Sequence, residues 1–156
     1  MNVRLALTII GIFFLLSISK THANPTGKSI SCHSILKEDL NYKNYKGISF
    51  ETEKSVRVVT LKMKNNKLKV VSKLTPYKIK KNNIYFKIKF IWYGNIFFEE
   101  FNLNRDNLNL TNTSKNQVRQ LKCKVIESDF MAEMNKVKEK YQNIFQQGVG
   151  KKINSF

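Results

Sequence analysis

The sequence has few of the residues from which catalytic and metal sites are usually built. Its 156 residues include two cysteines, two histidines and 11 acidic residues, against 28 lysines and arginines. It contains no glycine-rich phosphate loop, no serine-centred nucleophile turn and no cluster with metal-ligand spacing. Two cysteines and the neighbouring His33 are too few ligands for a zinc site. The sequence therefore predicts neither an enzyme nor a protein that holds a metal or another cofactor.

The remaining candidates for catalysis are also poor. His33 follows Cys32 directly, and adjacent residues in a strand point to opposite faces, so the two cannot form a dyad within one strand. Glu99 and Glu100 fail as a carboxylate pair for the same reason. Glu51 and Glu53 share a face, as an acid–base pair would, but they lie in a short segment near Lys54, where a solvated strand end explains them without chemistry.

Long apolar runs are lacking too, except at the start of the chain. The basic opening MNVR precedes 14 mostly apolar residues, Leu5 to Ile18, and a small-residue pattern that ends at Ala23. We interpret residues 1–23 as a signal peptide; a membrane anchor is the alternative. As a helix the run spans ~21 Å, short of the ~30 Å of a bilayer core. We expect the remaining chain to be periplasmic or extracellular, with no transmembrane segment.

Export determines how the two cysteines are interpreted. In an oxidising compartment we expect Cys32 and Cys123 to form a disulfide that ties the first strand to the last; two free buried thiols are the alternative. Closing a loop of about 90 residues stabilises a domain by roughly 4–5 kcal/mol in the chain-entropy model.

From Lys28 to Ile126 the apolar residues mostly alternate with polar ones, which predicts seven to nine antiparallel strands. The expected segments are 30–35, 47–53, 55–64, 66–74, 83–94, 95–104, 107–111 and 118–126. We expect Pro76 to interrupt its strand and residues 111–117 to form a polar loop.

After Ile126 the apolar period becomes helical, which predicts one helix over residues 128–148, capped by Ser128 and ended by Gly148. The expected domains are 24–127 for the sheet, 128–148 for a helix packed on it or across its open end, and 149–156 for a tail. A membrane-lying helix is the alternative. The fold class is α+β: a β-meander or small barrel with a C-terminal helix.

The stretch FNLNRDNLNLT, residues 101–111, precedes the cysteine of LKCKVI by about a dozen residues. It resembles a pattern in small, mostly uncharacterised exported proteobacterial β-proteins, in which an Asn-Arg or Asp-Arg pair ends a strand and a cysteine-bearing strand closes the fold. Asn104 and Arg105 match this pair, and Leu110 matches the return strand. The usual Thr-Gly turn is replaced by Asn107 and Leu108. The resemblance implies an exported β-fold and no particular activity.

Lysine pairs at i and i+2 recur along the predicted strands, so that each pair projects from one face. Together the pairs would build a basic surface for anions. An alternative is that exposed lysines only keep strand faces soluble. Removing Arg4 and Lys20 with the signal peptide leaves a net charge of 17 − 2 = +15, which exceeds the ~2–8 that solubility requires. The pairs are Lys62 and Lys64, Lys67 and Lys69, Lys78 and Lys80, Lys87 and Lys89, and Lys122 and Lys124.

These observations predict a non-enzymatic binding protein for anionic envelope components: an acidic glycan, lipopolysaccharide or lipid head groups. The alternative is a protein-interaction, immunity or inhibitor-type module that recognises an acidic protein. Nucleic acid is less favoured because of the exported location. A barrel that carries a small apolar ligand would need a cavity, and we expect the bulky inward side chains of residues 86–92 to fill the interior.

Overall fold

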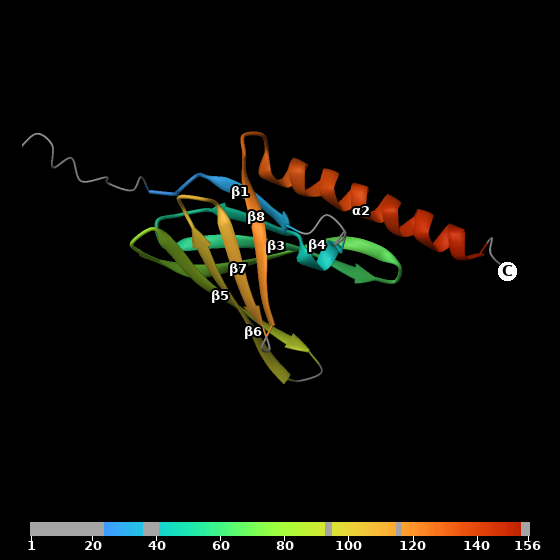
Figure 1. The fold of residues 1–156 in the computed structure, drawn as a ribbon, viewed down its shortest axis with the longest axis horizontal. Helices are drawn as coiled ribbons and strands as arrows, with labels where there is room; N and C mark the ends of the chain where they lie inside the picture. Colours follow the sequence, from blue (N-terminus) through green and yellow to red (C-terminus); the bar gives the residue numbers. More distant parts are fainter. Residues whose placement is uncertain (1–23, 36–40, 93–94, 115–116, 154–156) are drawn as a thin grey trace, which may run out of the picture.

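The computed structural model describes residues 24–35, 41–92, 95–114 and 117–153, so the predicted signal peptide, residues 1–23, lies outside the described residues. Eight antiparallel strands form a closed barrel in which each strand pairs with its sequence neighbours and the last pairs with the first (Figure 1). One helix follows the barrel. This confirms the predicted α+β architecture. The elements are β1 (Ser29–Ser34), η1 (Tyr42–Asn44), β2 (Lys46–Phe50), β3 (Ser55–Lys64), β4 (Lys67–Lys80), β5 (Asn83–Trp92), β6 (Asn95–Asn104), β7 (Asn109–Ser114), β8 (Gln117–Ile126) and α2 (Phe130–Ile153).

Apolar side chains from all eight strands fill one part of the barrel interior. The rings of Phe86 and Phe101 stack there with centroids 4.9 Å apart, and Tyr77 meets Phe50 edge to face at 5.4 Å. Inward and outward residues alternate as the period-two pattern predicts. The buried residues of this cluster are Ile30, Cys32, Ile48, Phe50, Val56, Val58, Tyr77, Ile84, Phe86, Ile88, Phe101, Leu103, Leu110, Leu121 and Cys123.

A disulfide joins Cys32 to Cys123, as the sequence predicts. The two residues lie directly opposite each other in the β1–β8 ladder, with their Cα atoms 4.0 Å apart. The bridge therefore lies at the seam where the last strand meets the first and the barrel closes. It links positions separated by 91 residues.

Helix α2 packs on the outside of the barrel, and not across its open end. Met134 is fully buried against the outward side chains of Val59 and Leu61 on β3. The helix reaches close to the sheet at Gly47, where a Cβ would overlap the sulfur of Met134 and lie 3.2 Å from the ring of Phe130. Strand β3 is thus covered on both faces.

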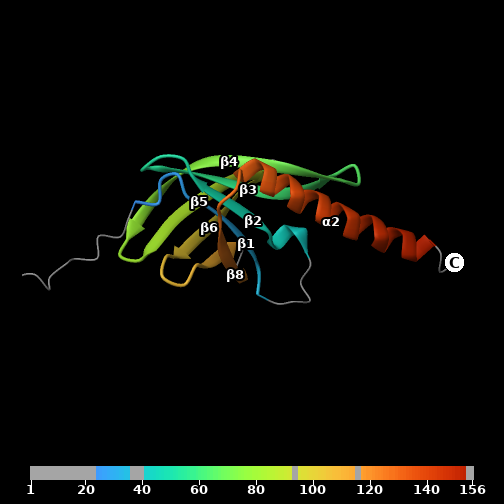
Figure 2. The same cartoon turned by 90° about the horizontal axis from the view of Figure 1, so that it is seen from above.

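The β3–β4 hairpin and α2 project from the barrel on the same side (Figures 1 and 2). Gln142 of the helix holds the hairpin end: its Oε1 accepts from the amide of Leu68 at 2.7 Å, and its Nε2 donates to the carbonyl of Asn66 at 3.2 Å. Asn65 and Asn66 both have positive φ, as a tight hairpin turn requires. The helix therefore fixes the orientation of this hairpin. Within the described residues no helix combines the length and apolar character needed to cross a membrane.

Strands β4 and β7 extend further than predicted. Strand β4 runs through Pro76, because this residue closes the β3 ladder opposite Ser55 and the next residue, Tyr77, begins pairing with β5. Proline lacks an N–H, so it fits where the strand changes neighbours. Strand β7 extends to Ser114, so most of the predicted loop 111–117 is strand.

The predicted bounds of the C-terminal helix also need correction. Asp129, and not Ser128, caps the helix, since its Oδ1 accepts from the amide of Ala132 at 2.7 Å. The helix continues past Gly148 to Ile153, within the predicted tail. A glycine inside a helix costs only about 1 kcal/mol relative to alanine, so by itself it does not end one.

Candidate functional site

Beyond Ile88 the barrel interior is hollow. It holds a cavity of about 660 Å³, lined on one side by the apolar side chains of Val58, Ile88 and Phe90. The expectation that bulky side chains fill the whole interior is therefore wrong at this end. The side chain of Trp92 lies outside the part of the chain that is described. A cavity of this size suits a small organic molecule.

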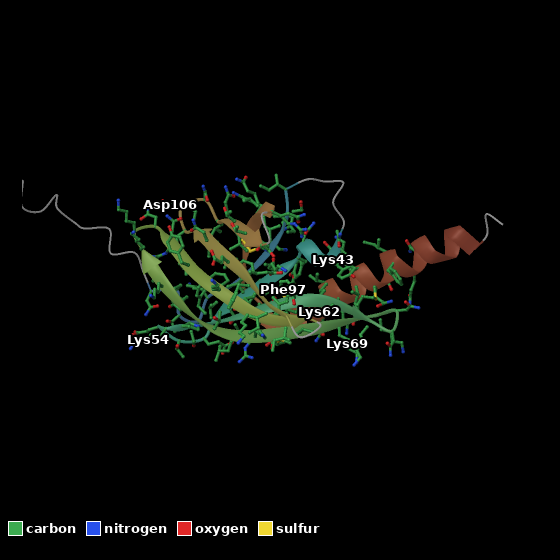
Figure 3. All side chains as sticks on the ribbon, turned by 90° about the horizontal axis from the view of Figure 1, so that it is seen from below. Lys43, Lys54, Lys62, Lys69, Phe97 and Asp106 are labelled. Carbon is green, nitrogen blue, oxygen red and sulfur yellow. A yellow bond between two sulfur atoms is a disulfide. The ribbon has the colours of Figure 1, made fainter. Side chains whose placement is uncertain are left out.

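The cavity lining is strongly cationic. Five of the described lining residues carry positive charge and Glu99 alone carries negative charge, which gives 5 − 1 = +4. Figure 3 shows Lys43 and Lys62 in this region, at the opposite end of the barrel from Lys54 and Asp106. Clustered like charges surrounded by low-dielectric walls raise the local concentration of counter-ions. The five are Lys43, Lys46, Lys62, Lys73 and Arg119.

Lys46 lies deepest among these cations. It is only 5 % exposed, and its Nζ lies 3.5 Å from Oε2 of Glu99 and donates to the carbonyl of Lys43 at 3.3 Å. Burial lowers the pKa of Lys46, and the neighbouring Glu99 carboxylate opposes this shift by raising it. Both contacts are long, and an ammonium has three donors, so Lys46 can still donate to a bound molecule.

Asn112 provides a second buried polar group in the cavity wall. It is 6 % exposed, and its Oδ1 is shielded from solvent without a hydrogen-bond partner among the described residues. Its backbone neighbours in the ladders are Phe101 on β6 and Arg119 on β8. Leaving a buried acceptor unpaired costs about 1–3 kcal/mol, so this atom marks a place where a ligand donor would gain a partner.

Arg119 is oriented by its neighbours at the cavity rim. Its Nη1 donates to Oδ1 of Asn44 at 2.7 Å, and its Nη2 donates to Oε1 of Gln117 at 2.9 Å. A guanidinium has five N–H donors in a fixed plane, so these two bonds position the group without exhausting it. Arg119 is exposed, and it therefore remains accessible to an anion.

On another side, the cavity reaches a split in the barrel wall. Strands β4 and β5 are paired only from Tyr77–Phe86 to Lys80–Asn83, and beyond this point their backbones separate. Two side chains bridge the gap: Thr75 donates to the carbonyl of Lys87 at 2.7 Å, and Lys73 donates to that of Lys89. Next to the cavity, side-chain hydrogen bonds thus replace the backbone hydrogen bonds between β4 and β5.

The predicted lysine pairs lie on two different faces of the sheet. Lys62 and Lys64 on β3 pair with Lys69 and Lys67 on β4. All four lie on the same face as Val58, which is the inner face, while Leu61 and Leu68 on the other face pack beneath α2. The projecting hairpin therefore continues the inner wall of the cavity as a basic concave strip, which we call the concave lysine face (Lys62, Lys64, Lys67 and Lys69).

The other six lysines point outward. Lys87 donates to Oε1 of Glu100 at 2.7 Å and lies 4.4 Å from the ring centroid of Phe98. Lys124 lies 3.8 Å from Glu133 of α2. The expected single basic surface is therefore divided, because strand alternation predicts which residues share a face and not which face turns inward. The outward set is Lys78, Lys80, Lys87, Lys89, Lys122 and Lys124.

The weaker catalytic candidates lie away from the cavity. His33 is exposed, while its neighbour Cys32 is buried in the disulfide. Glu51 receives a 2.8 Å hydrogen bond from Arg57, and Glu53 accepts from Asn24 at 3.1 Å. These carboxylates are thus engaged at a strand end, as the solvated interpretation predicts.

Lys46, Asn112 and Arg119 are cavity residues that the sequence pattern does not predict. A signal was present, since Lys46 alternates with Ile48 and Phe50, and Arg119 alternates with Leu121. A polar residue at an inward position of a strand indicates an interior that is not wholly apolar. No protein-family model, curated protein or solved structure matches this chain.

Proposed function

We propose that this protein is an exported, non-enzymatic binding protein for an anionic envelope component, which it holds in the barrel cavity and along the concave lysine face. The observation that carries the proposal is the excess of positive charge at one place: five cations and one carboxylate line the cavity. The adjoining hairpin adds three further lysines, Lys64, Lys67 and Lys69, on the same inner face.

The inward position of these cations favours a binding role over the alternative that the lysines only keep the chain soluble. Lysines that serve only solubility point outward into water, as Lys78 and Lys80 do. Lys46 instead has its ammonium inside the barrel, where burial lowers its pKa and costs free energy. A bound anion would offset this cost in the same way as Glu99 does in part.

Export is supported by the character of residues 1–23 and by the disulfide, since disulfides persist in oxidising compartments. The resemblance of residues 101–111 to exported proteobacterial β-proteins supports the same compartment. A non-enzymatic role fits the engagement of Cys32 in the disulfide and of Glu51 with Arg57.

Inorganic polyphosphate tests the proposal, because it is a polyanion that carries neither sugar nor lipid. Two matched charge reversals on β4 are compared: Lys67→Glu with Lys69→Glu on the concave lysine face, and Lys78→Glu with Lys80→Glu on the outer face. We expect the concave pair to weaken binding at least tenfold more than the outer pair, with a steep salt dependence in the wild type. Equal losses for both pairs would contradict a dedicated face.

A second candidate function, recognition of an acidic protein, is favoured by one observation on the outer sheet face. Ile91 and Ile96 are cross-strand neighbours that remain exposed, and the adjacent cross-strand pair is Lys89 and Phe98. Exposed apolar side chains beside cations are a common composition for protein interfaces. Charge reversals on the concave lysine face would leave such a partner bound, while Ile91→Asp would release it.

A further inference from the structure

The cavity has a polar floor and an apolar side wall, and this combination narrows the chemistry of its ligand. Lys46, Glu99 and Asn112 provide a donor and acceptors on three different strands, β2, β6 and β7. Val58, Ile88 and Phe90 provide the apolar surface beside them. Lys62 and Arg119 add positive charge at the exposed rim.

A long acyl chain fits this interior poorly. It would cover Oδ1 of Asn112 and both charged groups of the Lys46–Glu99 pair without offering any hydrogen bond. Each buried polar group that loses water without gaining a partner costs about 1–3 kcal/mol, and more where it is charged. The polar floor therefore disfavours binding of a long acyl chain, which a wholly apolar barrel interior would favour.

A hydroxyl-rich ligand satisfies the same groups. A hydroxyl both donates and accepts, so one hydroxyl can donate to Oδ1 of Asn112 while another accepts from Nζ of Lys46 and donates to Glu99. The ring of Phe90, stacked on Phe97 with centroids 5.6 Å apart, gives a flat apolar surface for the C–H face of a sugar ring.

The rim cations select for negative charge on such a ligand. Nζ of Lys62 lies over the Phe90 ring, 6.0 Å from its centroid, so a positive charge stands at the same aromatic ring. Arg119, which also lines the cavity, is held by Asn44 and Gln117 with part of its planar donor set still available. Planar guanidinium donors match the two oxygens of a carboxylate or phosphate.

We propose that the cavity binds a negatively charged sugar, with its hydroxyls on Asn112, Lys46 and Glu99, one ring face on Phe90, and its acidic group at Lys62 and Arg119. This inference rests on the proposed anion-binding function and specifies its ligand class. The concave lysine face then extends the site for further charged units of a longer acidic glycan.

Calorimetric titration of the purified protein with three probes tests the inference. Trigalacturonate has both the sugar rings and the negative charge of the proposed ligand. The neutral galactose trisaccharide has only the sugar rings, and decanoate has only the negative charge. We expect trigalacturonate to bind at least tenfold more tightly than either of the others. Tighter binding of decanoate would overturn the inference in favour of an acyl ligand. Equal binding of the neutral trisaccharide, or no binding of any probe at millimolar concentration, would also overturn it.

The variant Asn112→Leu has nearly the same shape and removes the buried acceptor. We expect it to weaken trigalacturonate binding at least tenfold, while Thr113→Leu, on the opposite face of β7, leaves binding unchanged. Should Asn112→Leu fail to fold, the Asn112 side-chain amide resonances of the wild type provide the readout, and their failure to shift with trigalacturonate overturns the inference. Polyphosphate binding that retains its dependence on the concave lysine face would show that the proposed function survives.

Discussion

Nζ of Lys46 lies 3.5 Å from Oε2 of Glu99 inside the barrel, and the two side chains come from strands that do not pair with each other. Lys46 has a side-chain exposure of 6 % and Glu99 one of 23 %, so the ammonium is the more deeply buried partner. Breaking a buried ion pair by removing one partner is more harmful than replacing both, because the remaining charge has no counter-charge.

This relationship predicts the outcome of a double-mutant cycle. Glu99→Leu leaves the Lys46 ammonium buried without its counter-charge and should lower the free energy of unfolding by roughly 1–3 kcal/mol, less than for a fully buried pair because Glu99 is partly exposed. Lys46→Met with Glu99→Leu should lie within about 1 kcal/mol of the wild type. Urea denaturation measures all variants. Additive effects of the two single changes would refute the coupling.

The lowered pKa of Lys46 also predicts a pH dependence. Between this lowered pKa and the ordinary value of 10.5, the unfolded chain binds more protons than the folded chain, so stability rises with pH across that window. Lys46→Met lacks this contribution. The wild type should therefore gain free energy of unfolding relative to Lys46→Met as the pH is raised toward 10.5. Burial raises the pKa of Tyr45, but this residue is common to both proteins and cancels.

A count of seven to nine strands, the disulfide and the order of an antiparallel sheet followed by a helix could be predicted, because each depends on local pattern or on simple pairing, whereas the choice between an open meander and a closed barrel stayed open. Alternation in β5 identifies Phe86 and Ile88 as inward residues from sequence alone. In β3, by contrast, Val56 and Val58 face the interior while Val59 and Leu61 face α2, so apolar residues occupy both sides. The alternation of apolar and polar residues therefore does not predict which face of β3 lies in the barrel interior.

The cavity could not be predicted, because it depends on where strands β4 and β5 stop pairing and separate. Phe86 and Phe101 fill the barrel where β4 and β5 are still paired, and the hollow begins where this pairing stops. The split follows from the length of the β3–β4 hairpin, whose outer half is held by α2 instead of by β5. Such long-range competition between neighbours leaves no local signal in the sequence.

The hydrogen bonds of Gln142 predict a local effect on the hairpin. Gln142→Ala removes one bond to Leu68 and one to Asn66, and should lower the free energy of unfolding by about 1 kcal/mol. The amide of Leu68 should exchange with solvent faster in native-state hydrogen exchange. Gln146→Ala, one turn further along the helix at an exposed position, is the matched control and should change neither quantity.

The close approach of α2 to the sheet predicts that a side chain at Gly47 destabilises the protein. Gly47→Ala would press a methyl group against the sulfur of Met134 and the ring of Phe130, which should cost about 1–3 kcal/mol. In the background of Met134→Ala the same change should cost less, because the space is then free. A thermal denaturation cycle of the four proteins measures this coupling, and an unchanged cost of Gly47→Ala would show that the helix does not pack there.

The disulfide between Cys32 and Cys123 predicts a large redox dependence of stability, since it joins the two strands that close the barrel. Reduction frees a loop of 91 residues in the unfolded chain and should lower the free energy of unfolding by roughly 3–5 kcal/mol. Urea denaturation with and without dithiothreitol measures the difference. The variant Cys32→Ala with Cys123→Ala should unfold as the reduced protein does and be insensitive to the reductant.

Under reducing conditions the amides of β1 and β8 should lose hydrogen-exchange protection before those of β5 and β6, because only the first pair of strands loses a covalent link. Coincident unfolding curves in the two conditions would mean that the bridge adds nothing to a ladder already held by backbone pairing.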